Sequence, residues 1–127
     1  MLSEPPIDNA AIDAGGEAVP SVTEVLRAAL APLAAGIDAA FIYGPTARGA
    51  VTGHIDVMII GSEIAYADVI PGFIAAAKYI GRTINPSVYS ATDWSHKLAA
   101  GNRVVLAVLK QRKIFLIGSE DGIPQPR

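Results

Sequence analysis

Apolar side chains recur at helical spacing in the segment that begins at Ser21. Ser21 and Glu24 have the spacing of a capping box, in which each side chain binds the backbone amide of the other residue. Gly36 is a natural stop for a helix. The pattern therefore predicts a helix over residues 21–35. The positions that share its apolar face are Val22, Val25, Leu26, Ala29, Leu30 and Leu33.

Two short runs rich in isoleucine, valine and aromatic residues follow this helix. They cover residues 39–43 and 55–60, and each stops at a glycine, Gly44 and Gly61. Continuous apolar runs of this length are typical of strands that are covered on both faces. The link between them, residues 44–53, is too short for a helical crossover. We therefore expect the two strands to be antiparallel or nearly so.

Proline and glycine divide the next part of the chain. Residues 66–80 have a helical pattern, which Pro71 and Gly72 are expected to interrupt because proline fits a first turn and breaks a helix interior. Residues 83–89 predict a third strand. Because Pro86 cannot donate a backbone hydrogen bond, we expect this strand at an edge of the sheet or at a bulge.

The remaining elements complete an α/β (α+β) pattern. Residues 92–100 and 104–109 predict helices, with Gly101 as the stop of the first, and residues 113–117 predict a last strand. This order of elements predicts a mixed β-sheet with helices packed on it.

The N-terminal segment has a different composition. Residues 1–20 contain the acids Glu4, Asp8, Asp13 and Glu17, no lysine or arginine, and no sustained apolar period. We expect a flexible acidic tail over residues 1–20, one folded domain over 21–118, and a C-terminal tail over 119–127.

Length and composition suit one compact domain. The chain has 127 residues, of which 51% are hydrophobic and 17% charged, and it has no cysteine with which to form a disulfide. No apolar run approaches the roughly 20 residues that cross a bilayer, and the first residues do not resemble a signal peptide. We therefore expect a cytoplasmic protein that does not enter a membrane.

A local excess of basic side chains occurs near the C-terminus, with no acid between Asp93 and Glu120. It would suit phosphate binding, or equally a solvated helical face. Aromatic residues, at 6% of the chain, are too few to suggest a platform for single-stranded nucleic acid. The basic residues are Lys97, Arg103, Lys110, Arg112 and Lys113.

The candidate chemistry lies at the turn after the first strand. A strand that ends at Gly44 and enters a turn aims backbone amides at one place, which suits phosphate oxygens. His54 and Asp56 lie two residues apart on the second strand, so they share a face of it. Together they could hold a metal ion against the phosphate, as phosphoryl transfer requires.

These residues resemble the signature of the DNA polymerase beta type nucleotidyltransferase superfamily, in its small, minimal branch. That signature is Gly-Ser-x-Ala-Arg-Gly, a spacer, and then Ser-Asp-x-Asp-Leu before an apolar strand. The residues that match are Gly44, Ala47, Arg48, Gly49 and Asp56.

Later segments, residues 81–89, 100–102 and 113–118, are similar to a bacterial group in which this domain often follows a DNA-binding winged helix. The resemblance covers residues 37–118 and implies a nucleotidyltransferase-like fold. Because the stretch before Ser21 is too short for a winged helix, we expect no DNA-binding domain in this chain.

The resemblance also implies roles for individual residues. Asp56 would be the catalytic residue and, with His54, would hold Mg²⁺ or Mn²⁺. The reaction would transfer a nucleoside monophosphate from a nucleoside triphosphate to a hydroxyl group. The residues that would contact the nucleotide are Gly44, Thr46, Arg48 and Gly49.

Three departures from the signature weaken the expected activity. Pro45 replaces a serine and offers neither its hydroxyl nor its amide. His54 replaces the first metal-binding aspartate, and Mg²⁺ prefers oxygen ligands, whereas Zn²⁺ or Mn²⁺ would tolerate nitrogen. Residues 83–89, where the superfamily usually has a third carboxylate, contain no acid. We therefore expect weak or absent metal binding and weak or lost nucleotidyl transfer.

Structural alternatives remain for each candidate. Asp56 could instead pair with Arg48, His54 could be an ordinary loop-edge histidine, and Thr46 could cap a helix. At the level of function, the alternative is a non-catalytic interaction module on the same fold, with a regulatory, antitoxin-like role and a protein partner or a second copy of the chain. The remaining alternative is a small mixed-sheet domain whose resemblance is accidental.

Overall fold

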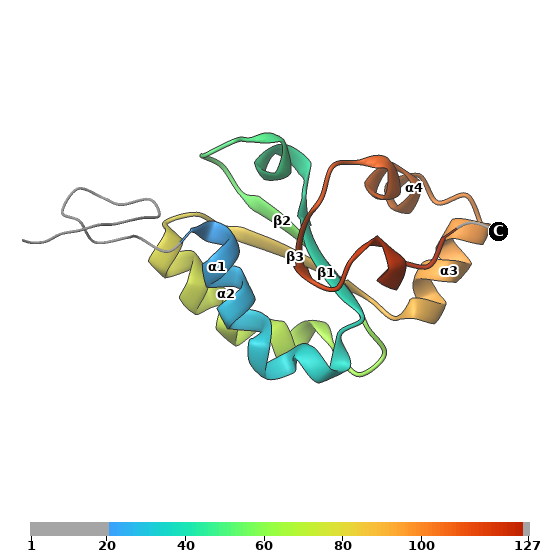
Figure 1. The fold of residues 1–127 in the computed structure, drawn as a ribbon, viewed down its shortest axis with the longest axis horizontal. Helices are drawn as coiled ribbons and strands as arrows, with labels where there is room; N and C mark the ends of the chain where they lie inside the picture. The colour runs from blue at the N-terminus through green and yellow to red at the C-terminus, as the bar shows by residue number, and fades with distance from the viewer. Residues whose placement is uncertain (1–20, 126–127) are drawn as a thin grey trace, which may run out of the picture.

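A computed structural model describes residues 21–125 of the chain, so the predicted acidic tail, residues 1–20, lies outside the described residues. Over the described residues the fold is α+β, with a mixed sheet between two layers of helices (Figure 1). The helices are α1 (Val22–Leu30), α2 (Tyr66–Ile80), α3 (Ala91–Ala99) and α4 (Arg103–Lys110), and the strands are β1 (Ala39–Tyr43), β2 (Ile55–Ile60), β3 (Ile84–Tyr89) and β4 (Ile114–Ile117).

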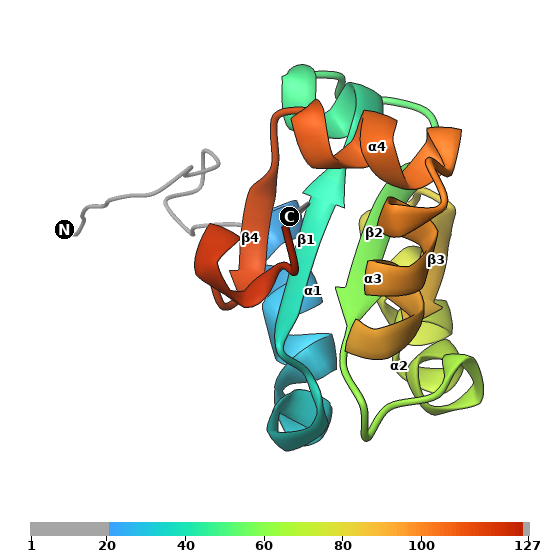
Figure 2. The same ribbon diagram turned by 90° about the vertical axis from the view of Figure 1, so that its right-hand side faces the viewer.

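The sheet has the strand order β3-β2-β1-β4. β1 pairs antiparallel with β2, as its short connection predicts, and also antiparallel with β4. β2 and β3 are parallel because α2 carries the chain back between them. In Figure 2, α3 and α4 cover the near face of the sheet while α1 and α2 lie behind it.

Alternation along the strands divides the core between the two faces. Ile42, Val57 and Ile59 pack with α1 and α2, whereas Phe41 and Met58 pack with Trp94 of α3 and with α4. β1 and β2 are therefore covered on both faces, which explains why their sequences are almost continuously apolar.

The first predicted helix is shorter than expected. Its capping box is present, since Ser21 and Glu24 bind each other's backbone amides at 2.9 and 3.1 Å. The α-helix ends at Leu30, however, and a 3-10 helix continues from Ala31 to Gly36. Pro32 lies in the first turn of that segment and cannot donate the next helical hydrogen bond, so the winding changes there.

The predicted interruption of the second helix is wrong. α2 runs without a break from Tyr66 to Ile80 with Pro71 inside it. The carbonyl that Pro71 leaves without a helical partner belongs to Ala67, and both residues are exposed, so water can bind it. Gly72 serves close packing instead: an added Cβ would lie 3.3 Å from the Ala29 carbonyl oxygen of α1.

Pro86 lies in the edge strand β3, as predicted. The carbonyl oxygens of Thr83 and Tyr89 accept hydrogen bonds from backbone amides at the two ends of β2. The backbone N–H and C=O groups of the odd-numbered residues in this segment therefore point toward β2, and those of the even-numbered residues point toward the open edge. Pro86 therefore faces outward and removes a donor from the open edge. A missing donor at this place hinders another strand from pairing with the sheet.

The fold extends beyond Gly118, where the sequence placed a C-terminal tail. Ile123 is buried against the α3 and α4 side of the sheet, and the Trp94 indole donates to the Pro124 carbonyl oxygen at 3.0 Å. None of the helices between residues 21 and 125 is long and apolar enough to cross a membrane.

Candidate functional site

Gly44 and Asp56 meet at the end of β1 and the start of β2. In the antiparallel register Tyr43 is opposite Asp56, which brings Gly44 against the Asp56 carboxylate. A Cβ added to Gly44 would lie 2.7 Å from Asp56 Oδ2, and Gly44 has a positive φ of 75°. Both the close approach and the backbone conformation therefore require glycine at this position.

The turn after Gly44 is a 3-10 helix, Gly44–Arg48, that ends at Gly49 in the left-handed region. Pro45 lies in its first turn, where a missing amide does no harm to the backbone. The N-cap position belongs to Tyr43, so the alternative of Thr46 as a helix cap is wrong. The 3-10 turn thus begins with Gly44, which lies against the Asp56 carboxylate.

Asp56 has polar neighbours from the connection just before β2, which carries His54, and from β3. Its Oδ1 accepts a hydrogen bond from Asn85 Nδ2 at 3.2 Å and lies 3.4 Å from His54 Nε2. The Asp56 side chain is 14% exposed, whereas that of His54 is 57% exposed. His54 and Asp56 therefore meet at one carboxylate oxygen, while Arg48, the alternative partner, binds Gln111 instead.

Asn85 occupies the position beside Asp56 in the parallel register of β2 and β3. It comes from residues 83–89, where the resemblance implied a third carboxylate, and it presents a neutral amide there. Within residues 21–125, no three acids, histidines or cysteines gather where they could hold a metal ion together. The donors at this place are one carboxylate, one imidazole and one amide.

Gln111 closes the other side of the turn. Its side-chain oxygen accepts a hydrogen bond from the Gly44 amide at 3.1 Å and a longer one from Arg48 Nη1 at 3.5 Å. Gln111 directly follows α4, which lies across the end of β1 in Figure 2. A carboxamide oxygen thus takes the Gly44 amide that the sequence predicted as a donor to phosphate.

Lys113 holds the loop that carries Gln111. Its ammonium donates to the carbonyl oxygens of Leu109 and Gln111 at 2.7 and 3.1 Å and pairs with Glu120 at 3.1 Å. The Lys113 side chain is only 3% exposed, so these acceptors replace the water that it loses. Lys113 is therefore a structural residue, although it belongs to the basic cluster noted in the sequence.

Tyr43 faces the same site from β1. Burial is the main cause that raises the pKa of its hydroxyl above the ordinary value of 10.0, and the charge of Asp56 and the neighbouring Tyr89 act in the same direction. A hydrogen bond with Ser87 opposes them only partly. Tyr43 thus stays a neutral hydroxyl beside Asp56 at physiological pH.

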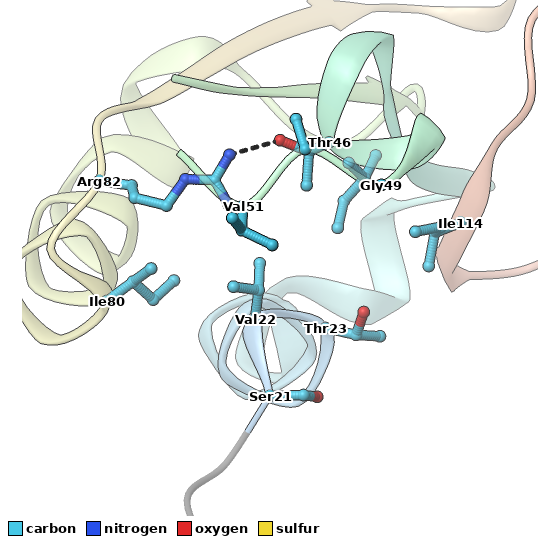
Figure 3. A pocket seen from close by; sticks show the side chains of 11 residues that line it. Ser21, Val22, Thr23, Thr46, Gly49, Val51, Ile80, Arg82 and Ile114 are labelled. Atoms are coloured by element: carbon cyan, nitrogen blue, oxygen red, sulfur yellow. Dashed lines mark hydrogen bonds between the residues drawn. The ribbon is translucent and has the colours of Figure 1, made fainter. Parts of the chain in front are cut away.

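Thr46 contributes to a different place. Its hydroxyl accepts a hydrogen bond from Arg82 Nη2 at 2.7 Å at the wall of a cavity on the α1 side of the sheet (Figure 3). Gly49 lines the same cavity. Of the predicted site residues, the structure brings Gly44, His54 and Asp56 together, with Arg48 reaching the group through Gln111.

The sequence did not identify Asn85, Gln111 or Tyr43 as members of the site. Asn85 had a usable signal, because it lies in residues 83–89, the segment that would carry a third ligand. Gln111 had none, because its contact with Gly44 spans 67 residues. No protein-family model matches the chain, and no curated protein matches it either.

Proposed function

We propose that this domain binds a nucleoside triphosphate weakly at the Gly44 turn, together with a divalent metal at Asp56, and that its nucleotidyl transfer is weak or lost. The observation that carries the proposal is the contact between Gly44 and the Asp56 carboxylate. It brings the Gly44 backbone beside a carboxylate that could hold a metal ion, as the nucleotidyltransferase resemblance requires, and Gln111 would have to release the Gly44 amide to a phosphate. On that resemblance we also place the protein in the bacterial cytoplasm.

Charge around the turn favours an anionic ligand. Arg48 is exposed at the end of the turn, and Lys110 and Arg112 are exposed on either side of Gln111 in the chain. The Asp56 carboxylate supplies one opposing charge, and its neighbour Asn85 is neutral. A triphosphate would therefore meet a local excess of positive charge.

The donor set fits Mg²⁺ poorly. Mg²⁺ prefers oxygen ligands in octahedral geometry, whereas His54 offers a nitrogen and Asp56 is the nearby carboxylate. Mn²⁺ accepts mixed nitrogen and oxygen ligands and suits these residues better. When bound, such an ion would neutralise charge on the phosphates, and Asp56 would hold it there.

Weak transfer follows from what surrounds Asp56. Holding two ions about 4 Å apart and activating a hydroxyl needs several anionic oxygens. Asp56 has a neutral amide on one side and an imidazole on the other. The chain thus keeps a place for phosphate and lacks the charge that makes the reaction fast.

Calorimetry of the full chain with ATP, GTP, CTP and UTP, each with Mn²⁺ or Mg²⁺, tests this proposal. We expect weak binding that is stronger with Mn²⁺ and falls about tenfold or more in Arg48→Ala, since a hydrogen bond to a charged group is worth about 1.5–3 kcal/mol. Lys78→Ala, an exposed cation on α2, is the matched control. Absence of binding by all four nucleotides contradicts the proposal. A separate assay follows the transfer of labelled nucleotide, and efficient transfer contradicts the expected weak or lost activity.

A second candidate function is an interaction module on the same fold, in a regulatory, antitoxin-like role. The observation that favours it is the exposure of large apolar side chains along α2: Tyr66, Ile74 and Tyr79 are 54%, 55% and 64% exposed. Size-exclusion chromatography with light scattering tests it. A dimer that Ile74→Lys dissociates supports a protein contact through α2, and a monomer at all concentrations excludes self-association.

A further inference from the structure

The cavity lined by Thr46 and Gly49 lies on the opposite side of the sheet from Asp56, between the start of α1, the loop after Gly44 and the end of α2. It has a volume of about 430 Å³, within the usual range for small-molecule sites. Figure 3 shows α1 below it and the loop that carries Thr46, Gly49 and Val51 above it. The apolar part of its wall comes from Val22, Ile42, Ala50, Val51, Ile80 and Ile114.

Arg82 is the cationic residue in this wall. It is half-buried and donates to three neutral oxygens of the loop: Gly53 O at 2.8 Å from Nε, and Thr46 Oγ1 at 2.7 Å and Thr52 O at 3.1 Å from Nη2. Within residues 21–125 no carboxylate forms an ion pair with it. Nη1, the remaining nitrogen, makes none of these three bonds.

A charge that is partly removed from water and has no counter-ion is unfavourable, and an anion that enters the cavity would relieve it. One guanidinium neutralises one negative charge. The other polar groups of the wall, the hydroxyls of Ser21, Thr23 and Thr46, are neutral and suit carboxylate oxygens. The remaining surface is apolar and suits a hydrocarbon body.

We propose that this cavity binds a small aliphatic carboxylic acid, with its carboxylate on Arg82 and its chain against the apolar wall. The site is separate from the proposed nucleotide site and does not depend on it. The Thr46–Arg82 hydrogen bond connects them, because Thr46 belongs to the turn that begins at Gly44. A ligand that binds the Arg82 guanidinium should therefore also shift the NMR signals of the turn that begins at Gly44.

The test titrates the full chain with octanoate and, separately, with 1-octanol, followed by backbone amide chemical shifts and calorimetry. We expect octanoate to shift Thr23, Ala50 and Arg82 and to bind about tenfold or more tightly than octanol, because only octanoate pairs with the guanidinium. Absence of shifts at these residues, or equal binding of the two molecules, overturns the proposal.

Two variants distinguish the contribution of the Arg82 charge to binding from the contribution of the cavity itself. Arg82→Met keeps the length of the side chain and should bring octanoate down to the affinity of octanol. Ala50 lines the cavity and takes no part in the Arg82 bonds, so Ala50→Trp should block the cavity and abolish binding of both molecules, whereas Ala99→Trp, at an exposed position on α3, should leave both unchanged. Octanoate binding that survives Ala50→Trp overturns the proposal even if Arg82→Met fails to fold.

Discussion

The side-chain oxygen of Gln111 accepts a hydrogen bond from the backbone amide of Gly44, at 3.1 Å and across 67 residues of sequence. The amide that the turn would offer to a phosphate is thus already bound within the protein. Any anion that binds at Gly44 has to displace this carboxamide. The binding free energy of the anion is therefore weakened by the free energy of the Gly44–Gln111 hydrogen bond.

Gln111→Ala should expose the Gly44 amide. We expect faster hydrogen exchange at Gly44, a loss of about 1 kcal/mol of stability from the missing hydrogen bond, and tighter binding of inorganic tripolyphosphate. Amide exchange by NMR and chemical denaturation measure the first two effects. Gln125→Ala, an exposed glutamine near the C-terminus, is the control. Unchanged exchange at Gly44 would show that the contact is not maintained in solution.

Gly44→Ala should be more destabilising than backbone conformation alone explains. Gly101 has the same φ of 75° but no heavy atom within 4 Å of an added Cβ, so Gly101→Ala measures the backbone cost by itself. At Gly44 the added Cβ also meets Asp56 Oδ2, and we expect a further loss of about 1–3 kcal/mol. Urea denaturation measures the free energy of unfolding of both variants. If Gly44→Ala and Gly101→Ala lose the same amount of stability, the Asp56 carboxylate moves away from the added Cβ at no cost.

Asn85→Asp should create a stronger metal site. It places a second carboxylate beside Asp56, so the two charges repel each other and the protein loses stability at neutral pH. Mn²⁺ would bind the pair in the folded state and raise the melting temperature. Asn85→Ala removes the same amide without adding charge and should show no such rise. If Mn²⁺ does not raise the melting temperature of Asn85→Asp, the two side chains do not converge on one ion.

The stability of the protein should fall at high pH because of Tyr43. Its folded-state pKa is raised above 10.0, mainly by burial, so the folded protein keeps a proton that the unfolded chain releases. The stabilisation is complete below about pH 10 and is lost as the pH rises through the folded-state pKa. Tyr43→Phe should make the free energy of unfolding less dependent on pH above 10. An unchanged slope would assign the effect to another group.

Local pattern was enough for most of the elements. β1 and β2 have the predicted bounds because their apolar runs end at glycines that stop a strand. The pattern failed at Pro71, where an exposed carbonyl tolerates the missing donor, and at Pro32, which ends α1 early. Both errors concern proline. The effect of a proline depends on whether the carbonyl that loses its partner is exposed to water and on the type of helix around it, and local sequence specifies neither.

The sequence by itself determined the mixed α+β fold and the pairing that brings Gly44 near Asp56, since a short antiparallel connection allows little else. Only the tertiary structure decided which groups fill the site. Asn85 reaches Asp56 through the parallel register of β3, and Gln111 reaches Gly44 from the far end of α4. Such contacts join residues distant in the chain, and the packing of whole elements, rather than any local motif, sets their geometry.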